Sequence, residues 1–103
     1  MALAKVTVIV DAENVRRSVW PNIPARELVQ LVEAWAEREG HRPLVVFEGE
    51  ETADDVIARW AAAPQEPYWL VTSDRGLRAR AGGGAERVVG GGAFARMLRD
   101  LKS

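Results

Sequence analysis

The chain has 103 residues, no cysteine and a net charge of −1. This length predicts a single domain over residues 1–103, and the lack of thiols excludes disulfide bonds and thiolate metal sites. Hydrophobic residues make up 48% of the chain, a fraction typical of a packed globule. No apolar stretch approaches the ~20 residues needed to cross a bilayer, and the apolar start is too short for a signal peptide. We therefore expect a cytoplasmic protein with no membrane partner.

Strand and helix patterns alternate along the chain. The first strand is β-branched and nearly all apolar, as in a strand buried on both faces. The first long helix has apolar residues at three- and four-residue spacing, and it is followed by Gly40, a typical helix end. The expected elements are a strand at 5–10, a helix at 25–39, a strand at 43–47, a helix from Thr52 to before Pro64, a strand at 68–72, a helix at 75–81, a strand at 86–89 and a helix at 93–101.

This succession predicts an α/β fold, in which a mostly parallel four-stranded sheet lies between two layers of helices as a three-layer α/β/α domain. Sheets of this kind bind ligands beyond the carboxyl ends of their strands, where the strand order reverses. With strand order 2-1-3-4, that point lies between the first and third strands. Chemistry is therefore expected at the residues that directly follow each strand.

Carboxylates follow the first three predicted strands. Asp11 follows the first strand, Glu48 and Asp54 follow the second, and Asp74 follows the third. Clustered carboxylates repel one another unless a proton or a cation lies between them. Oxygen ligands favour a hard ion such as Mg²⁺ or Mn²⁺, and such an ion activates water for attack on a phosphate. The sequence thus predicts a metal site for phosphodiester hydrolysis.

Each of these acids also has a structural explanation. Asp11 is placed to cap the following turn, and Asp74 to cap the next helix. Thr52 and Asp55 have the spacing of a capping box, which makes Asp54 the better site candidate and Asp55 a doubtful one. The coincidence of acids at three strand ends favours a site over three separate caps.

Two glycine triplets and several aromatic residues have less specific interpretations. The triplet at 90–92 precedes a helix and is able to cradle a phosphate, but we favour helix caps and loops for both triplets. Trp20 is expected to anchor a loop, with stacking on a nucleic-acid base as the alternative. We expect His41 on a loop surface, and in the core Trp35, Trp60 and Trp69.

Charge is distributed unevenly. Residues 1–74 hold 7 Lys/Arg and 13 Asp/Glu, a balance of −6, whereas residues 75–103 hold 7 and 2, a balance of +5. The basic second part suits phosphate contacts beside a metal site, and solvated helix faces explain it equally well. Arg75, next to Asp74, is the candidate for substrate binding. The other arginines of this part considered for phosphate contacts are Arg78, Arg80, Arg96 and Arg99.

Three segments resemble the PIN-like nucleases, in particular the YacP-related branch of the NYN domains. They are VIVDAENV at 8–15, VVFEGEETADDVI at 45–57 and WLVTSDRGLRARAGGGAERV at 69–88. The resemblance implies a metal-dependent RNA-cleaving domain with Mg²⁺ or Mn²⁺ as cofactor and RNA as partner. Asp11, Asp54 and Asp74 would be its metal ligands, directly or through water.

The same resemblance assigns supporting roles. Asn14 would orient the first carboxylate or the substrate, and Thr72 and Ser73 would hydrogen-bond the acidic cluster or a phosphate. The chain departs from the family at Glu48, where some relatives have aspartate, and in the segment after it, which usually includes another strand. The chain would therefore be active only as a homodimer, or it would be a catalytically inactive RNA- or protein-binding module on the same fold, which is the alternative function. A receiver-like or nucleotide-binding domain ranks last, because neither a strand-end lysine nor a phosphate loop is evident.

Overall fold

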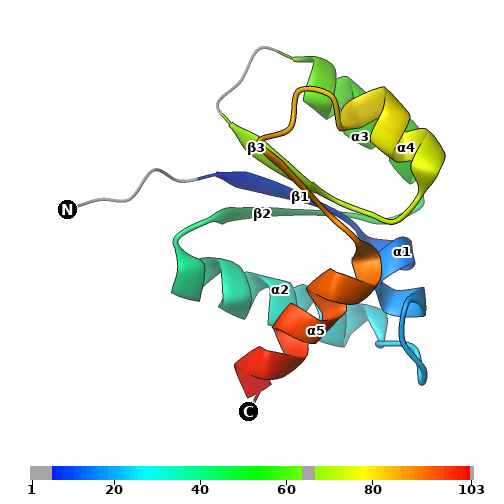
Figure 1. The fold of residues 1–103 in the computed structure, drawn as a ribbon. Helices are drawn as coiled ribbons and strands as arrows, with labels where there is room; N and C mark the ends of the chain where they lie inside the picture. Colours follow the sequence, from blue (N-terminus) through cyan, green and yellow to red (C-terminus); the bar gives the residue numbers. More distant parts are fainter. Residues whose placement is uncertain (1–5, 64–66, 103) are drawn as a thin grey trace.

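Four strands and five helices make up the computed structural model, which describes residues 6–63 and 67–102 (Figure 1). Every predicted strand and helix is present, with boundaries shifted by a few residues. The expected first residue of the first strand, Lys5, lies outside the described residues. The elements are β1 (Thr7–Asp11), α1 (Ala12–Arg17), α2 (Ala25–Glu39), β2 (Arg42–Val46), α3 (Ala53–Ala62), β3 (Tyr68–Val71), α4 (Arg75–Ala81), β4 (Arg87–Val89) and α5 (Gly91–Lys102).

Helix α1 is the element that the sequence patterns missed, since no helix was expected between the strand at 5–10 and the helix at 25–39. Its side chains explain why a helix forms there. Glu13 pairs with Arg16 at 2.7 Å and with Arg17 at 3.1 Å, which are the three- and four-residue spacings that stabilise a helix. Val15, on the opposite side, is fully buried in the core.

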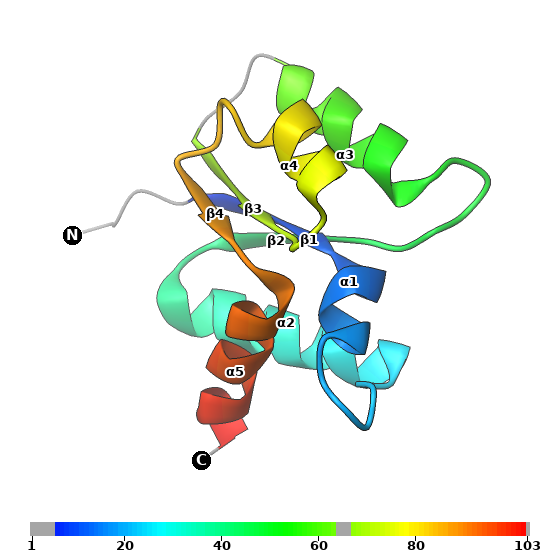
Figure 2. The ribbon, with the colours of Figure 1, turned by 45° about the vertical axis from the view of Figure 1, so that its right-hand side comes forward.

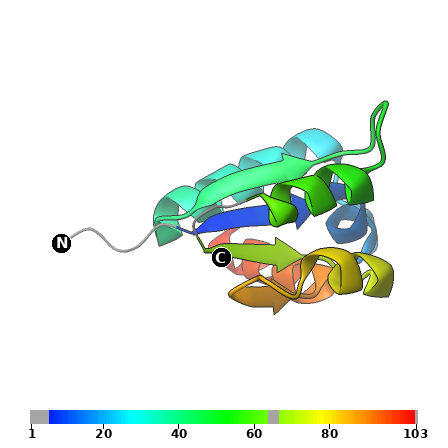
Figure 3. The same ribbon diagram turned by 90° about the horizontal axis from the view of Figure 1, so that it is seen from above.

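The sheet has the strand order β2-β1-β3-β4, and all of its described pairings are parallel, as predicted. Strand β1 lies in the middle, where Ile9 aligns with Leu44 of β2 and with Leu70 of β3. A strand paired on both sides and covered on both faces is buried, which explains the apolar run at its centre, Val8, Ile9 and Val10, all fully buried. Figure 3 shows the strands side by side with their carboxyl ends toward the same edge.

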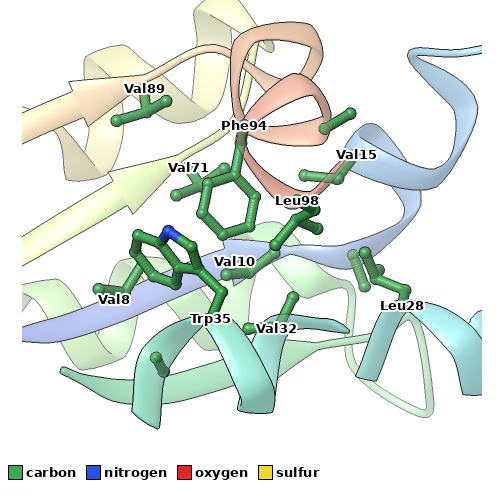
Figure 4. Packing of buried hydrophobic residues seen from close by; sticks show 13 residues of the cluster. Val8, Val10, Val15, Leu28, Val32, Trp35, Val71, Val89, Phe94 and Leu98 are labelled. Carbon is green, nitrogen blue, oxygen red and sulfur yellow. The ribbon is translucent and has the colours of Figure 1, made fainter. Parts of the chain in front are cut away.

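Helices cover both faces of the sheet, so the predicted three-layer α/β/α fold is confirmed. Alternating residues of β1 point to opposite layers: Val8 and Val10 join the core under α1, α2 and α5, whereas Ile9 joins the core under α3 and α4. In the first core, Trp35 packs edge-to-face against Phe94 with ring centroids 5.0 Å apart (Figure 4).

The order of the connections creates a reversal between β1 and β3. The chain leaves β1 through α1 and α2 on one face to reach β2, and it then passes through α3 on the other face to reach β3. From β3 it continues outward through α4 to β4. The carboxyl ends of β1 and β3 are therefore neighbours from which the chain departs in opposite directions, as the sequence analysis expected.

The predicted environments of Trp60 and His41 were wrong. Trp60 is 45% exposed, because the buried positions of α3 are Ala53 and Ile57, and a residue three places beyond Ile57 lies at the rim of that stripe. His41 is not on an open surface: its ring centroid lies 4.7 Å from that of Trp69 and 5.5 Å from that of Trp35. Its buried Nδ1 has no hydrogen-bond partner among the described residues.

Two further features complete the fold. Helix α2 ends at Gly40, whose φ of 78° lies in the left-handed region that favours glycine. Within residues 6–63 and 67–102, no helix is both long enough and apolar enough to span a membrane.

Candidate functional site

A pocket of about 420 Å³ lies at the carboxyl edge of the sheet, where β1 and β3 end. Five carboxylates and one guanidinium line it, so its field is strongly negative. Four of the five acids are those that the sequence placed after the strands. The lining residues are Asp11, Glu13, Asn14, Arg17, Ser18, Glu48, Asp54, Ser73 and Asp74.

Asp11, at the end of β1, is the most buried of these acids, with 7% of its surface exposed. It occupies the N-cap position of α1, but its side chain makes no capping hydrogen bond. Instead, Oδ2 accepts a 2.9 Å hydrogen bond from the Thr72 hydroxyl. Burial raises the pKa of Asp11, and the negative charges of Asp54 and Asp74 raise it further, although the Thr72 hydroxyl opposes them.

Thr72, fully buried just beyond β3, connects several parts of the site. Its backbone N–H donates to the Val89 carbonyl, which holds it against β4. Its hydroxyl donates to Asp11 and also accepts a 3.1 Å hydrogen bond from the Asp74 N–H. Its carbonyl accepts a 2.9 Å hydrogen bond from Nε of Arg78. Thr72 thus holds the first carboxylate in a fixed orientation relative to the start of α4.

Asp74 caps α4 and lines the pocket at the same time. Its Oδ1 accepts a 2.9 Å hydrogen bond from the Leu77 N–H, which confirms the predicted cap. The cap uses one of its two carboxylate oxygens, and within the described part of the chain no donor hydrogen-bonds the other. The structural and the functional interpretation of Asp74 are therefore compatible.

Asp54, in the first turn of α3, approaches the pocket from the opposite layer of helices. Its side chain is half-buried. Burial raises the pKa of Asp54, and the negative charge of Asp74 raises it further, against the effect of Arg80. Asp11, Asp54 and Asp74 therefore interact electrostatically across the pocket.

Asp55 and Glu48 differ in their relation to the site. The Thr52 hydroxyl accepts a 3.1 Å hydrogen bond from the Asp55 N–H, so the predicted cap of α3 is present. The Asp55 carboxylate is exposed and pairs with Arg80 at 3.1 Å, and hydrogen bonds from Arg80 and then Thr52 lower its pKa. Asp55 links α3 to α4 and does not line the pocket, whereas exposed Glu48 does.

Asn14 and Ser73 hold the loop that carries Asp74. The Asn14 Oδ1 accepts a 2.8 Å hydrogen bond from the Ser73 N–H, and the Ser73 Oγ accepts a 2.8 Å hydrogen bond from the Gly91 N–H. A β-carbon on Gly91 would overlap Oδ1 of Asn14. The glycine at the start of α5 thus allows close packing against α1, and its N–H is already occupied, which argues against a phosphate cradle at that atom.

Some functional candidates differ from the sequence-based set. Arg75 is exposed and does not line the pocket. Arg17, Ser18 and Glu13 do line it and were missed, because α1 itself was missed. The four-residue spacing from Glu13 to Arg17, directly after a strand-end aspartate, is the signal that would have placed them on one face beside the site.

Apart from Arg17, the side chains around the pocket carry oxygen donors. Among the described residues, no three His, Asp or Glu side chains converge into a ready ligand group. Magnesium, however, keeps several of its waters and is usually held through one or two carboxylates. The pocket is lined by carboxylate and amide oxygens, which are the donor type that hard ions such as Mg²⁺ and Mn²⁺ prefer.

Comparison of the chain with protein-family models, curated proteins and solved structures finds no match in any of the three.

Proposed function

We propose that this protein is a divalent-metal-dependent endoribonuclease of the PIN-like type. One observation carries the proposal: carboxylates that follow three different strands line one pocket at the reversal of strand order. Burial raises the pKa of Asp11, and the negative charges of Asp54 and Asp74 raise it further. A bound cation removes that repulsion. The resemblance to the PIN-like family supplies the substrate class.

The residues in and around the pocket would have two roles: to hold the ion and to orient its ligands. Asp11, Asp54 and Asp74 would hold Mg²⁺ or Mn²⁺. When bound, the ion would polarise a phosphate of the RNA and activate a water for attack on it. Thr72 keeps the Asp11 carboxylate in place through a 2.9 Å hydrogen bond. Asn14 holds the loop of Asp74 in place, because its Oδ1 accepts a hydrogen bond from the Ser73 N–H. These fixed orientations lower the entropy cost of binding the ion and the phosphate together.

The charge of the pocket makes RNA binding conditional. Its lining carries five carboxylates and one guanidinium, that of Arg17. A polyanion is repelled by this surface unless cations neutralise it. The proposal therefore requires RNA to bind and to be cleaved only when a divalent ion is present.

The direct test is incubation of the protein with labelled single-stranded RNA in Mn²⁺, Mg²⁺ or EDTA, beside Asp74→Asn. Asparagine is as good an N-cap as aspartate, so this variant keeps α4 capped while losing the charge. Glu33→Gln, a neutral change at an exposed position of α2, is the matched control. Cleavage is expected for the wild type and the control in Mn²⁺ and not for Asp74→Asn. No cleavage by any of them, over a range of RNAs, would remove the proposal.

A second candidate is an RNA- or protein-binding module without catalysis. It is favoured by the lack of a ready group of three ligands among the described residues and by the structural task that Asp74 already performs at α4. This candidate predicts salt-dependent RNA binding in EDTA that persists when Asp11 and Asp74 are both changed to asparagine. Absence of RNA binding at low salt, with no co-purifying partner, would remove it.

A further inference from the structure

Trp20 is the most exposed large apolar side chain of the described residues, with 85% of its surface accessible. The expectation that it anchors its loop was therefore wrong. The loop between α1 and α2 is anchored instead by Val19 and Ile23, which pack against the core on either side of it. Trp20 lies between these anchors and contributes no burial of its own.

Hydrogen bonds hold this loop at both ends. The Ile23 N–H donates to the Arg16 carbonyl at 3.1 Å, and Nε of Arg16 donates to the Ile23 carbonyl at 2.9 Å. Ser18 Oγ donates a further 2.6 Å bond to the Val15 carbonyl. The reciprocal pair closes the loop on Arg16, so the indole is held outward by a fixed backbone. Ordering of this kind before binding reduces the entropy that a ligand must offset.

Residues of this loop line two different hollows of the surface. Arg17 and Ser18, just before Trp20, line the acidic pocket. Pro21 and the three residues after it line a second groove of about 360 Å³, which α5 closes with Leu98 and Arg99. In Figure 2 the loop projects beyond α1, on the side of the sheet opposite to α3. Along the chain, Trp20 therefore lies between residues that line the pocket and residues that line the groove.

We propose that Trp20 stacks on an unpaired base of a single-stranded RNA whose backbone enters the acidic pocket, an inference that rests on the proposed function. An exposed indole offers a flat face to any base, and a base inside a duplex cannot reach it without leaving its stack. The cations of the two linings are Arg17, whose exposed guanidinium also pairs with Glu13 at 3.1 Å, and Arg99. Both would contact the flanking phosphates. Trp20 is thus a positioning residue, which selects single-stranded over double-stranded RNA.

The experiment compares wild type with Trp20→Ala, Trp20→Phe and Trp60→Ala. Trp60, exposed on α3 across the sheet, is the matched control. The probe is a fluorescein-labelled oligouridylate in Ca²⁺ and in Mn²⁺, with a double-stranded RNA of the same length beside it. We expect Trp20→Ala to raise the Kd for the single strand about 5- to 100-fold. Trp20→Phe is expected to retain most of the affinity, and Trp60→Ala all of it.

Kinetics and association state supply the remaining readouts. In Mn²⁺, loss of stacking is expected to raise KM for cleavage with little change in kcat. Unchanged Kd and KM in Trp20→Ala would overturn the inference, and if Asp74→Asn still abolishes cleavage, the proposed function survives that result. A wild type that neither binds nor cleaves RNA overturns both. If Trp20→Ala instead converts a dimer into monomers at unchanged RNA affinity, Trp20 is a contact between two copies of the chain and the inference is wrong.

Discussion

The hydroxyl of Thr72 donates a 2.9 Å hydrogen bond to Oδ2 of Asp11 and accepts a 3.1 Å hydrogen bond from the N–H of Asp74. One buried side chain thus connects the end of β1 with the start of α4. The bond to Asp11 is made away from water, because Thr72 is fully buried and Asp11 nearly so. The acids on either side of the sheet reversal are therefore placed relative to each other by a neutral residue.

Thr72→Val tests this connection, because valine keeps the shape and removes the hydroxyl. A buried carboxylate loses its donor and an N–H loses its acceptor, so the free energy of unfolding should fall by about 1–3 kcal/mol. Urea denaturation in EDTA measures the loss, and Thr72→Ser, which keeps the hydroxyl, should recover most of it. Equal stability of the valine variant and the wild type would show that these bonds contribute nothing net.

Gly91→Ala is expected to destabilise the protein although alanine is the better helix former. The new methyl group would overlap Asn14 Oδ1, and overpacking of this kind costs about 1–3 kcal/mol. Gly92→Ala, one residue further along α5, is the control, because its methyl group would meet nothing closer than Nη1 of Arg96 at 3.8 Å. The control should be stabilised by up to ~1 kcal/mol. Thermal denaturation of the two variants decides whether close packing or helix propensity dominates at this helix start.

The raised pKa of Asp11 gives the stability of the metal-free protein a particular pH dependence. Burial, and then the charges of Asp54 and Asp74, raise this pKa above its ordinary value of 3.8. Just above that value the folded chain holds the proton more strongly than the unfolded chain, so this carboxyl destabilises the fold as pH rises toward and through its folded pKa.

Asp11→Asn removes that penalty and still offers Thr72 an oxygen acceptor. In EDTA the variant should therefore have a higher Tm than the wild type at about pH 7, and the difference should shrink as the pH falls toward 3.8. Thermal melts across this range check the sign. A Tm difference that is independent of pH would show that the Asp11 charge is not unfavourable in the fold.

Asp54 and Asp55 are neighbours on α3 with opposite expected behaviour toward cations. Asp54 lines the pocket, whereas Asp55 is exposed and paired with Arg80. Addition of Mg²⁺ or Mn²⁺ should raise the Tm of the wild type and of Asp55→Asn, because an ion that binds only the folded state stabilises it. In Asp54→Asn this rise should be much smaller. Equal responses of the two variants would place the ion elsewhere.

Much of the fold follows from local pattern. The β-branched run that forms β1 and the apolar spacing of α2 each determine their own element, and the alternation of the elements then determines the parallel sheet and its order. The acids that follow the strands could be placed at one edge for the same reason. The helix caps formed by Thr52 and Asp74 could be predicted from residue type and spacing alone.

The remaining features depend on contacts between distant segments. The overlap that requires a glycine at position 91 involves Asn14, at the other end of the chain. The sequence around position 91 therefore does not predict this requirement. Trp60 lies at the rim of α3 because the inward stripe is set by Ala53 and Ile57, so its size and apolarity misled the prediction. Helix α1 was missed because it is short. It is stabilised by the ion pairs of Glu13 and not by a side-chain cap.

The hydrogen bond from the Gly91 N–H to Ser73 Oγ connects α5 to the loop that carries Asp74. Helix α5 thus supports the site although it supplies no acid to it. A fluctuation that detaches α5 breaks this bond, whereas the Ser73 N–H keeps its hydrogen bond to Asn14. Amide hydrogen exchange at Gly91 should therefore report the detachment of α5 separately from any opening at Ser73. A chain shortened to residues before α5 would retain Asp11, Asp54 and Asp74 but would lose the hydrogen bond that ties the loop of Asp74 to α5.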